Sequence, residues 1–392
     1  MWQGLRARAR IVRDLARLPV AAHAERRRDR AGLPAADPGS ERVLEALIDW
    51  LARAQDRSKS ADGGVARDFS LIKGWASSYP ETTGYIVPTV LDFARLRARA
   101  DVRERGRRMT DWLVRIQLPE GAFQGGKIDS VPCVPVTFNT GQVLLGLAAA
   151  ETEFGAYREP MRRAADWLVK TQDPDGCWRN YPSPFTAAGE KEYETHVAWG
   201  LIEAARLEPG RGYGESALAN VRWALSSQGS DGWFPRCCLD QATRPLTHTI
   251  AYALRGVLEA YRFSAEPSFL AAARRTADGL LSGMTDDGKL AGRFEAGWKP
   301  SATWVCLTGS AQTAHCALLL HRLTGETRYL EAGRLLNRFV RRTVRLDGPP
   351  DTRGGVKGSF PIDGEYGRYE YLDWGVKFLA DSLMLEMELD RH

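Results

Sequence analysis

One segment recurs along this chain at intervals of 55 to 62 residues, and it constrains the fold more than any other feature. Each copy carries a tryptophan in a helix-like stretch, a glutamine five residues later, and then an acidic residue followed by glycine. The clear copies are residues 50–55 with Asp62-Gly63, 112–117 with Glu120-Gly121, 167–172 with Asp175-Gly176, and 223–228 with Asp231-Gly232. Degenerate copies follow around Asp287-Gly288 and Asp347-Gly348. A fixed period of this length is typical of repeat architectures.

A second set of helix starts lies between these copies. They are at residues 81–84, 139–141, 194–196, 248–250, 307–309 and 373–375, and they contain Thr, Asn or Asp, which cap helices. The stretches that follow, such as 143–147, are apolar nearly all round, as in buried helices. The first set, such as 161–167, is amphipathic with arginine on one face. Six alternations predict an all-α fold, an (α/α)6 toroid of six helical hairpins with inner and outer helix rings.

The repeats resemble those of the α/α toroid proteins over roughly residues 40–390. This group includes terpenoid cyclases and protein prenyltransferases, and six-hairpin glycosidases, lyases and epimerases. The Gln-Asp-Gly-Trp turn is similar to the turn repeat of squalene and hopene cyclases. The whole chain also resembles uncharacterised toroid proteins of polysaccharide biosynthesis. The resemblance implies the fold and a saccharide substrate, although one scaffold of this kind hosts many chemistries.

The chain is expected to divide into a basic N-terminal arm, residues 1–38, and a toroid catalytic domain, residues 39–392. Residues 1–30 hold nine arginines against Asp14, Glu25 and Asp29, with apolar residues interleaved at helical spacing. Such an arm is suited to an anionic membrane surface or an acidic partner, or it is a helix packed on the outside of the toroid. No secretory signal or membrane-spanning run is recognised, so we expect a cytoplasmic protein, with peripheral membrane contact as the alternative.

The candidate site is the rim where the inner helices begin, because capping residues and short loops meet there and helix dipoles favour anions. Polar and aromatic side chains that suit catalysis gather on this rim. They are Tyr79, Glu81, Asn139, Glu194, His196, His248, Trp304, Tyr371 and Asp373. Convergence of so many on one cavity predicts an active site. The catalytic candidates are Glu81, Asp373, His196, His248 and Tyr371, and the substrate-binding candidates are Tyr79, Asn139, Glu194 and Trp304.

Two mechanisms fit these residues. Glu81 and Asp373 stand on the first and sixth inner helices, which ring closure makes neighbours, and two carboxyl groups about 6.5–9.5 Å apart suit an inverting glycosidase. Alternatively, His196 or His248 with Tyr79 or Tyr371 moves the proton at C5 of a uronic acid, as in a lyase or an epimerase. Asn139 would then neutralise the carboxylate.

Other functions are weighed by what the sequence lacks. The Asp-x-Asp-Asp motif of squalene-type cyclases is absent, so a terpenoid cyclase or prenyltransferase-like enzyme remains only an alternative. The six cysteines show no metal-ligand spacing, so neither a metal nor a cofactor is expected. No basic stripe indicates nucleic acid. A non-catalytic glycan-binding scaffold is the third hypothesis, and it predicts that the polar rim residues all serve as helix caps.

Overall fold

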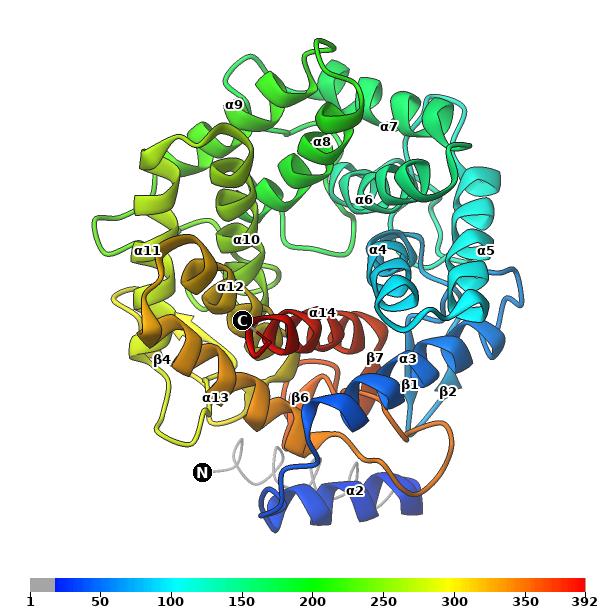
Figure 1. The fold of residues 1–392 in the computed structure, drawn as a ribbon, viewed down its shortest axis with the longest axis vertical. Coiled ribbons are helices and arrows are strands. Elements are labelled where there is room, and N and C mark those ends of the chain that lie inside the picture. The colour runs from blue at the N-terminus through cyan, green and yellow to red at the C-terminus, as the bar shows by residue number, and fades with distance from the viewer. Residues whose placement is uncertain (1–17, 392) are drawn as a thin grey trace, which may run out of the picture.

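The computed structural model describes residues 18–391 and confirms the predicted (α/α)6 toroid (Figure 1). The outer ring is α3 (Ser40–Asp56), α5 (Ala100–Ile116), α7 (Arg158–Thr171), α9 (Tyr213–Leu225), α11 (Pro267–Ser282) and α13 (Thr327–Thr343). The inner ring is α4 (Pro80–Arg97), α6 (Thr137–Phe154), α8 (Thr195–Leu207), α10 (Thr247–Ser264), α12 (Leu307–Thr324) and α14 (Asp373–Leu389). Each inner helix packs against the next, and α14 closes the ring against α4 and α3.

The recurrent glutamine joins neighbouring hairpins. In the second copy, Gln117 Nε2 donates to the carbonyl of Gly121 at 2.8 Å and to the carbonyl of Pro160, in the first turn of the next outer helix α7, at 3.0 Å. Gln172 makes the same pair of bonds with Gly176 and Ser216. The turn glycine has φ of +104° at Gly121, a conformation that favours glycine. The repeat seen in the sequence is therefore a structural link between hairpins.

Helix capping differs from the prediction. None of the inner helices within residues 18–391 has a side-chain hydrogen bond at its N-cap. The threonines instead lie inside the first turn and accept bonds from the preceding loop. Thr83 Oγ1 accepts from the amide of Val65, and Thr140 Oγ1 from the amide of Phe123, both at 3.0 Å. The polar residues beside them are thus left free of a capping role.

Short strands lie where the loops cross above the inner helices. One antiparallel sheet has the order β2 (Gly74–Trp75), β1 (Asp68–Ser70), β7 (Glu370–Leu372). The other pairs are β3 (Phe294–Glu295) with β4 (Lys299–Pro300), and β5 (Val305–Cys306) with β6 (Ser359–Phe360). The β1–β7 ladder joins the first and last hairpins. Within residues 18–391 we find no helix of the length and apolarity needed to cross a bilayer.

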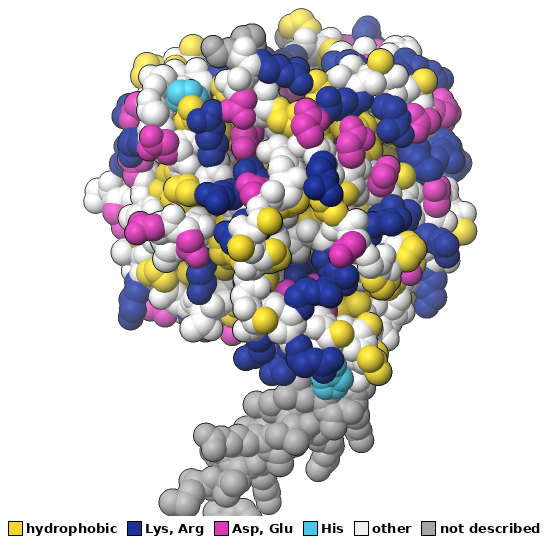
Figure 2. All heavy atoms as spheres, turned by 60° about the horizontal axis from the view of Figure 1, so that its bottom comes forward, with side chains coloured by type: hydrophobic (Ala, Val, Ile, Leu, Met, Phe, Trp, Pro, Cys, Tyr) yellow, Lys and Arg dark blue, Asp and Glu magenta, His cyan; other side chains and the backbone are white. Residues whose placement is uncertain are grey.

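The outer surface is covered by opposite charges that bridge neighbouring hairpins. Figure 2 shows basic and acidic side chains interspersed over one face. Arg105 forms an ion pair with Asp56 at 2.8 Å, and Arg162 with Glu208 at 2.8 Å. Some arginines on the outer helices are therefore paired with acidic residues of neighbouring hairpins.

The second half of the expected arm is a docked helix. α2 (Val20–Arg30) packs against the 345–371 segment through buried charges. Lys357 Nζ lies 3.0 Å from Glu25 and 2.5 Å from Asp29, and Asp29 also accepts the amide of Ile362 at 2.8 Å. α2 therefore matches the interpretation of a helix packed outside the toroid. The membrane interpretation concerns mainly residues 1–17, which lie outside the described residues.

We predict that Asp29→Ala destabilises the protein by about 3 kcal/mol, because it leaves a buried lysine with one fewer carboxylate and an unpaired amide. Urea unfolding of the full chain measures this. Asp347→Ala, at an exposed ion pair with Arg345, is the control and should change little. Equal stability of both variants would show that α2 contributes nothing to the toroid.

Candidate active site

A cavity of about 470 Å³ opens where the inner helices begin. Its wall is formed by the β1–β2 hairpin, the starts of α4, α6, α10 and α14, and the loops around residues 126–130 and 183–186. Four predicted site residues line it: Tyr79, Glu81, Asn139 and His248. The ring therefore brings together side chains that are up to 169 positions apart in the chain.

Glu81 lies in the first turn of α4 and lines the cavity. Tyr79 donates its hydroxyl to Glu81 Oε2 at 2.8 Å. Burial raises the pKa of Glu81 to about 7, while the Tyr79 bond and the charge of Arg67 act in the opposite direction. A carboxyl group with this pKa exchanges protons near neutral pH.

His248 lies in the first turn of α10. Its Nδ1 lies 2.7 Å from Oε1 of Gln312 on α12, so Nδ1 carries the proton that it donates. Burial lowers the pKa of His248 to about 4, against the effect of the Gln312 bond. The imidazole is thus neutral at physiological pH, with the lone pair on Nε2 available as a base.

Asn139 and the cavity walls complete the site. Asn139 Nδ2 is buried and finds no hydrogen-bond partner among residues 18–391, which leaves a donor for a ligand. Broad aromatic faces line the wall, among them Trp75, Tyr366 and Trp374. Trp374 Nε1 donates to Tyr366 Oη at 2.9 Å, which fixes both rings.

Charged groups at the wall balance one another only partly. Arg67 bridges Asp68 at 2.6 Å and Glu370 at 3.5 Å, and its guanidinium lies over the Trp374 ring, 5.0 Å from the centroid. The neighbouring acids raise the pKa of Arg67 despite its burial. Lys59, Lys73 and Lys127 also line the cavity.

Two candidates are buried directly behind the wall. Asp373 is 0% exposed, and its carboxylate accepts the Thr82 hydroxyl at 2.5 Å. Burial raises its pKa well above the usual range. His196 is also fully buried, with Nδ1 2.6 Å from Gln142 Oε1 and its ring 4.5 Å from that of Tyr252. Burial holds its pKa well below the usual range. Neither side chain lines the cavity.

Three further candidates point elsewhere, and their expected position must be corrected. Successive residues of a strand face opposite sides, so in β7 Glu370 lines the cavity while Tyr371 faces the α2 side. Trp304 packs against Gly292 and Gly364 in a separate apolar cluster.

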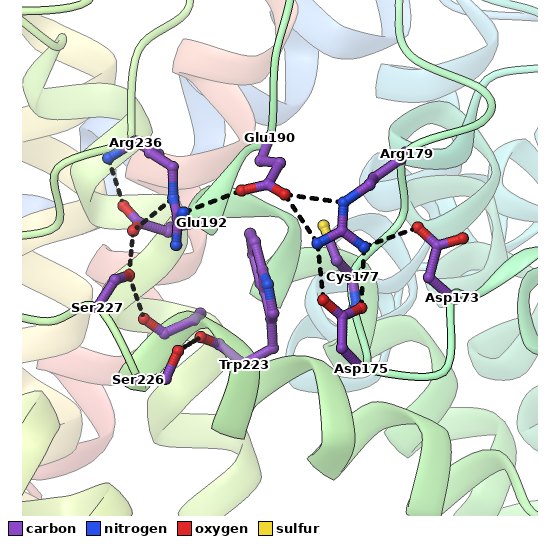
Figure 3. Close-up of polar contacts among 11 residues, drawn as sticks. Asp173, Asp175, Cys177, Arg179, Glu190, Glu192, Trp223, Ser226, Ser227 and Arg236 are labelled. Atoms are coloured by element: carbon purple, nitrogen blue, oxygen red, sulfur yellow. Dashed lines mark hydrogen bonds and ion pairs between the residues drawn. The ribbon is translucent and has the colours of Figure 1, made fainter.

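The third, Glu194, ends the 3-10 helix η1 (Glu192–Glu194) and is buried away from the cavity, where burial raises its pKa to about 8. The polar contacts around η1 are drawn in Figure 3, where Glu192 is held by Ser227 and Arg236. These contacts hold η1 in place, and Glu194 at its end is buried outside the cavity lining. The expected convergence of Glu81, Asn139, His196, His248, Tyr371 and Asp373 on one cavity thus holds for three of them.

A second cavity of about 380 Å³ lies at the opposite end of the ring, between the C-terminal halves of the inner helices. Its cations are largely paired: Lys377 with Asp381 at 2.5 Å, and Arg322 with Glu388 at 2.7 Å. It contains none of the predicted site residues. In the part of the chain described, no group of three or more His, Cys, Asp or Glu is arranged to hold a metal ion.

Several lining residues were missed by the sequence analysis. Tyr85 and Tyr252 stand four positions after Glu81 and His248, and positions i and i+4 share one helix face. Helical spacing from the candidates would therefore have found both. Trp75 and Arg67 come from the β1–β2 hairpin, for which the repeat pattern carries no signal.

Comparisons with known proteins agree with this architecture. Residues 80–258 match the family of the squalene-hopene cyclase C-terminal domain. No curated protein sequence matches significantly. Among solved structures, an unsaturated glucuronyl hydrolase specific for heparin has TM-score 0.71 and 14% identity, covering 90% of this chain and 99% of that one.

Two other solved structures are similar. A sugar epimerase from a ruminal bacterium gives TM-score 0.72 and 9% identity, with 88% of this chain and 97% of that one covered. An unsaturated glucuronyl hydrolase from Bacillus sp. GL1 gives 0.69 and 16%, with 88% and 96% covered. This chain is a six-hairpin α/α toroid protein. At identities this low, the structural similarity establishes the fold only. The reaction has to be inferred from the residues of the site.

We predict that Glu81→Gln stabilises the toroid at pH 8 and leaves its stability nearly unchanged near pH 4. The pKa of Glu81 is raised from an ordinary value of 4.5 to about 7, so the stability of the neutral carboxyl is present below about pH 4.5 and lost as the pH rises through 7. Glutamine stays neutral and still accepts the Tyr79 bond. Urea midpoints at both pH values test this, with exposed Glu159→Gln as the control. A gain of equal size at both pH values would contradict a raised pKa.

Proposed function

We propose that this chain is a carbohydrate-active enzyme that acts on an acidic oligosaccharide or polysaccharide in the cavity at the inner-helix N-termini. The observation that carries the proposal is the presence, in one cavity, of the neutral imidazole of His248 and a carboxyl group, Glu81, with a pKa near 7. Aromatic rings such as Trp75 and Trp374 suit the apolar faces of sugar rings. The glucuronyl hydrolases and the sugar epimerase of similar fold support the substrate class.

The chemistry that we favour is proton transfer at C5 of a uronic acid. His248 Nε2 takes the C5 proton, and the electron pair of that C–H bond moves toward the carboxylate. In elimination, this pair forms the C4–C5 double bond, the C4–O bond breaks, and protonated Glu81 gives its proton to the leaving oxygen. In epimerisation, a proton returns to the opposite face of C5. Both outcomes need one base and one acid in the same cavity.

Asn139 and Arg67 are the groups that would stabilise the substrate carboxylate. Abstraction of the C5 proton places negative charge on that carboxylate, and preorganised donors stabilise such charge. The Nδ2 of Asn139 has no partner among the described residues, and Arg67 carries its charge into the cavity wall.

Hydrolysis by Glu81 and Asp373 is the second candidate, supported by the fold similarity to glucuronyl hydrolases. It requires Asp373 to release Thr82 and reach the cavity, because its carboxylate is fully buried at present. For that reason we rank it below proton transfer at C5.

Two other functions are less well supported. An apolar terpenoid substrate fits poorly with a wall that carries Arg67, Asp68, Glu81 and three lysines. A non-catalytic scaffold predicted that the rim groups would serve as caps, whereas Glu81, Asn139 and His248 make no capping bond.

Variants separate the two mechanisms on glucuronate-containing oligosaccharides. Under proton transfer, His248→Gln and Glu81→Gln each lower kcat by about 10²–10⁴, because each removes a proton-transfer group, and Asp373→Asn has a much smaller effect. The product gains solvent deuterium or a C4–C5 double bond, detected by mass spectrometry and NMR.

Under hydrolysis the ranking of kcat changes. Asp373→Asn and Glu81→Gln are then the two slowest variants, and C5 keeps its original hydrogen. Full activity of both His248→Gln and Glu81→Gln would contradict the proposed site altogether.

The pH dependence of kcat/KM should report the same pair. Glu81 must be protonated to act as the acid, so activity falls as the pH rises through about 7. His248 must be neutral to act as the base, so activity falls as the pH drops through about 4. Activity in Gln312→Leu tests the assignment of the acid limb, because loss of that bond lowers the pKa of His248 further. If the fall of kcat/KM at low pH occurs at the same pH in this variant as in the parent, that fall reports a group other than His248.

A further inference from the structure

Three loops contribute residues to the mouth of the candidate cavity. They are the turn at residues 71–74 between β1 and β2, the loop at 125–135 and the loop at 181–187, together called the mouth rim. The amide of Ile128 donates to the carbonyl of Ser78 at 2.8 Å, and the Phe185 ring lies against Gly126. The loops at 125–135 and 181–187 are therefore in contact, and the first is also bonded to the segment that follows the β1–β2 hairpin.

Half of the large apolar side chains that are exposed among the described residues lie at this mouth. Six stand out as exposed within residues 18–391, and three of them lie in the loops around the mouth: Ile72, Val131 and Phe185. Tyr181, at the start of the third loop, stacks instead on Trp167 of α7. Val131 is 87% exposed and Phe185 is 55% exposed. Exposed apolar side chains that gather at one place are typical of a surface that contacts a protein, a membrane or a ligand.

Lysines gather at the same place. The chain has only nine lysines beside 45 arginines, yet three lysines and a single arginine line the cavity. Lys59 and Lys73 form no ion pair within the described part of the chain, while Lys127 lies 3.8 Å from Asp129. Four acidic residues line the cavity as well, so its formal charges balance. Asp68 and Glu370 are paired with Arg67, which leaves Lys59 and Lys73 as cations without an ion-pair partner among the described residues.

The loop with Tyr181 and Phe185 rises from a rigid base. Figure 3 shows Arg179 between Asp175 and Glu190, and Arg236 reaching the same Glu190. The ion pairs measure 2.7 Å for Arg179–Asp175, 2.8 Å for Arg179–Glu190 and 2.9 Å for Arg236–Glu190. Because both ends of the loop are held, its apolar tip is presented outward at little conformational cost.

We propose that the mouth rim docks on the surface of an anionic lipid bilayer. Exposed Val131, Phe185 and Ile72 would enter the interface between headgroups and acyl chains, and the lysines would contact lipid phosphates. The cavity then opens toward the headgroup layer. This inference concerns the mouth rim alone and depends neither on the proposed reaction nor on residues 1–17.

The native cysteines provide a direct probe. Cys133 on the mouth rim is the exposed cysteine, while the other five are buried. An environment-sensitive fluorophore attached to Cys133 of the full chain should shift to the blue with vesicles that contain phosphatidylglycerol. Nitroxide-labelled lipids should quench it. Vesicles of phosphatidylcholine alone should give a much smaller signal, and Cys133→Ser should take up no label.

Variants with matched controls decide the proposal in a vesicle flotation assay. Lys73→Glu with Lys127→Glu, and separately Val131→Ser with Phe185→Ser, should each weaken binding to phosphatidylglycerol vesicles about tenfold or more. Lys289→Glu with Lys299→Glu, and Val114→Ser, change the same residue types elsewhere and should bind like the parent. Circular dichroism and the urea midpoint verify folding.

Three outcomes would overturn the proposal. The first is a full chain that does not bind anionic vesicles. The second is unchanged vesicle binding by both rim double variants, together with a Cys133 fluorophore that does not respond to vesicles. That result would assign the vesicle binding to another surface. The third is a concentration-dependent dimer that only the rim variants break, which would assign the mouth rim to a second copy of this chain.

Discussion

The inner ring depends on contacts between helices that are too close for any side chain. A Cβ at Gly84 of α4 would lie 2.4 Å from the Cα of Val143 on α6, and one at Gly309 of α12 would lie 2.6 Å from the amide nitrogen of His248. Gly141 and Gly200 make equally close contacts around the ring. Because these glycines stand in or near the first turns, they hold the N-terminal ends of neighbouring helices together, and the cavity is built at those ends.

This close packing also sets the protonation of the site. Helix N-termini favour anions, yet the cavity wall excludes enough water that Glu81 has a pKa near 7 and His248 stays neutral. Asp373 and His196 also lie in the first turns of inner helices, yet they do not line the cavity and are bonded to Thr82 and Gln142. One carboxyl group and one imidazole thus line the cavity, while a second carboxyl group and a second imidazole at equivalent helix positions are buried.

The sequence was sufficient for the architecture and insufficient for side-chain direction. The period of Gln117 and Gln172 predicted six hairpins because each glutamine links one hairpin to the next. The position at the start of an inner helix correctly predicted that Glu81, Asn139 and His248 line the cavity. It could not separate them from Asp373 and His196, which lie in first turns as well but are buried. It failed for Tyr371, where the alternation of a short strand, invisible in the repeat, turns Glu370 to the cavity instead. Capping was also wrong, because the threonines bond to the preceding loop.

The central claim is that chemistry occurs between Glu81 and His248 at the inner-helix N-termini. A crystal structure of Glu81→Gln soaked with a glucuronate-containing oligosaccharide tests it most directly, because the slow variant retains the ligand. If the chemistry takes place at this site, a sugar ring lies between residue 81 and His248 Nε2, with its carboxylate near Asn139. A saccharide found instead in the cavity beside Lys377, or on the outer ring, would contradict the account.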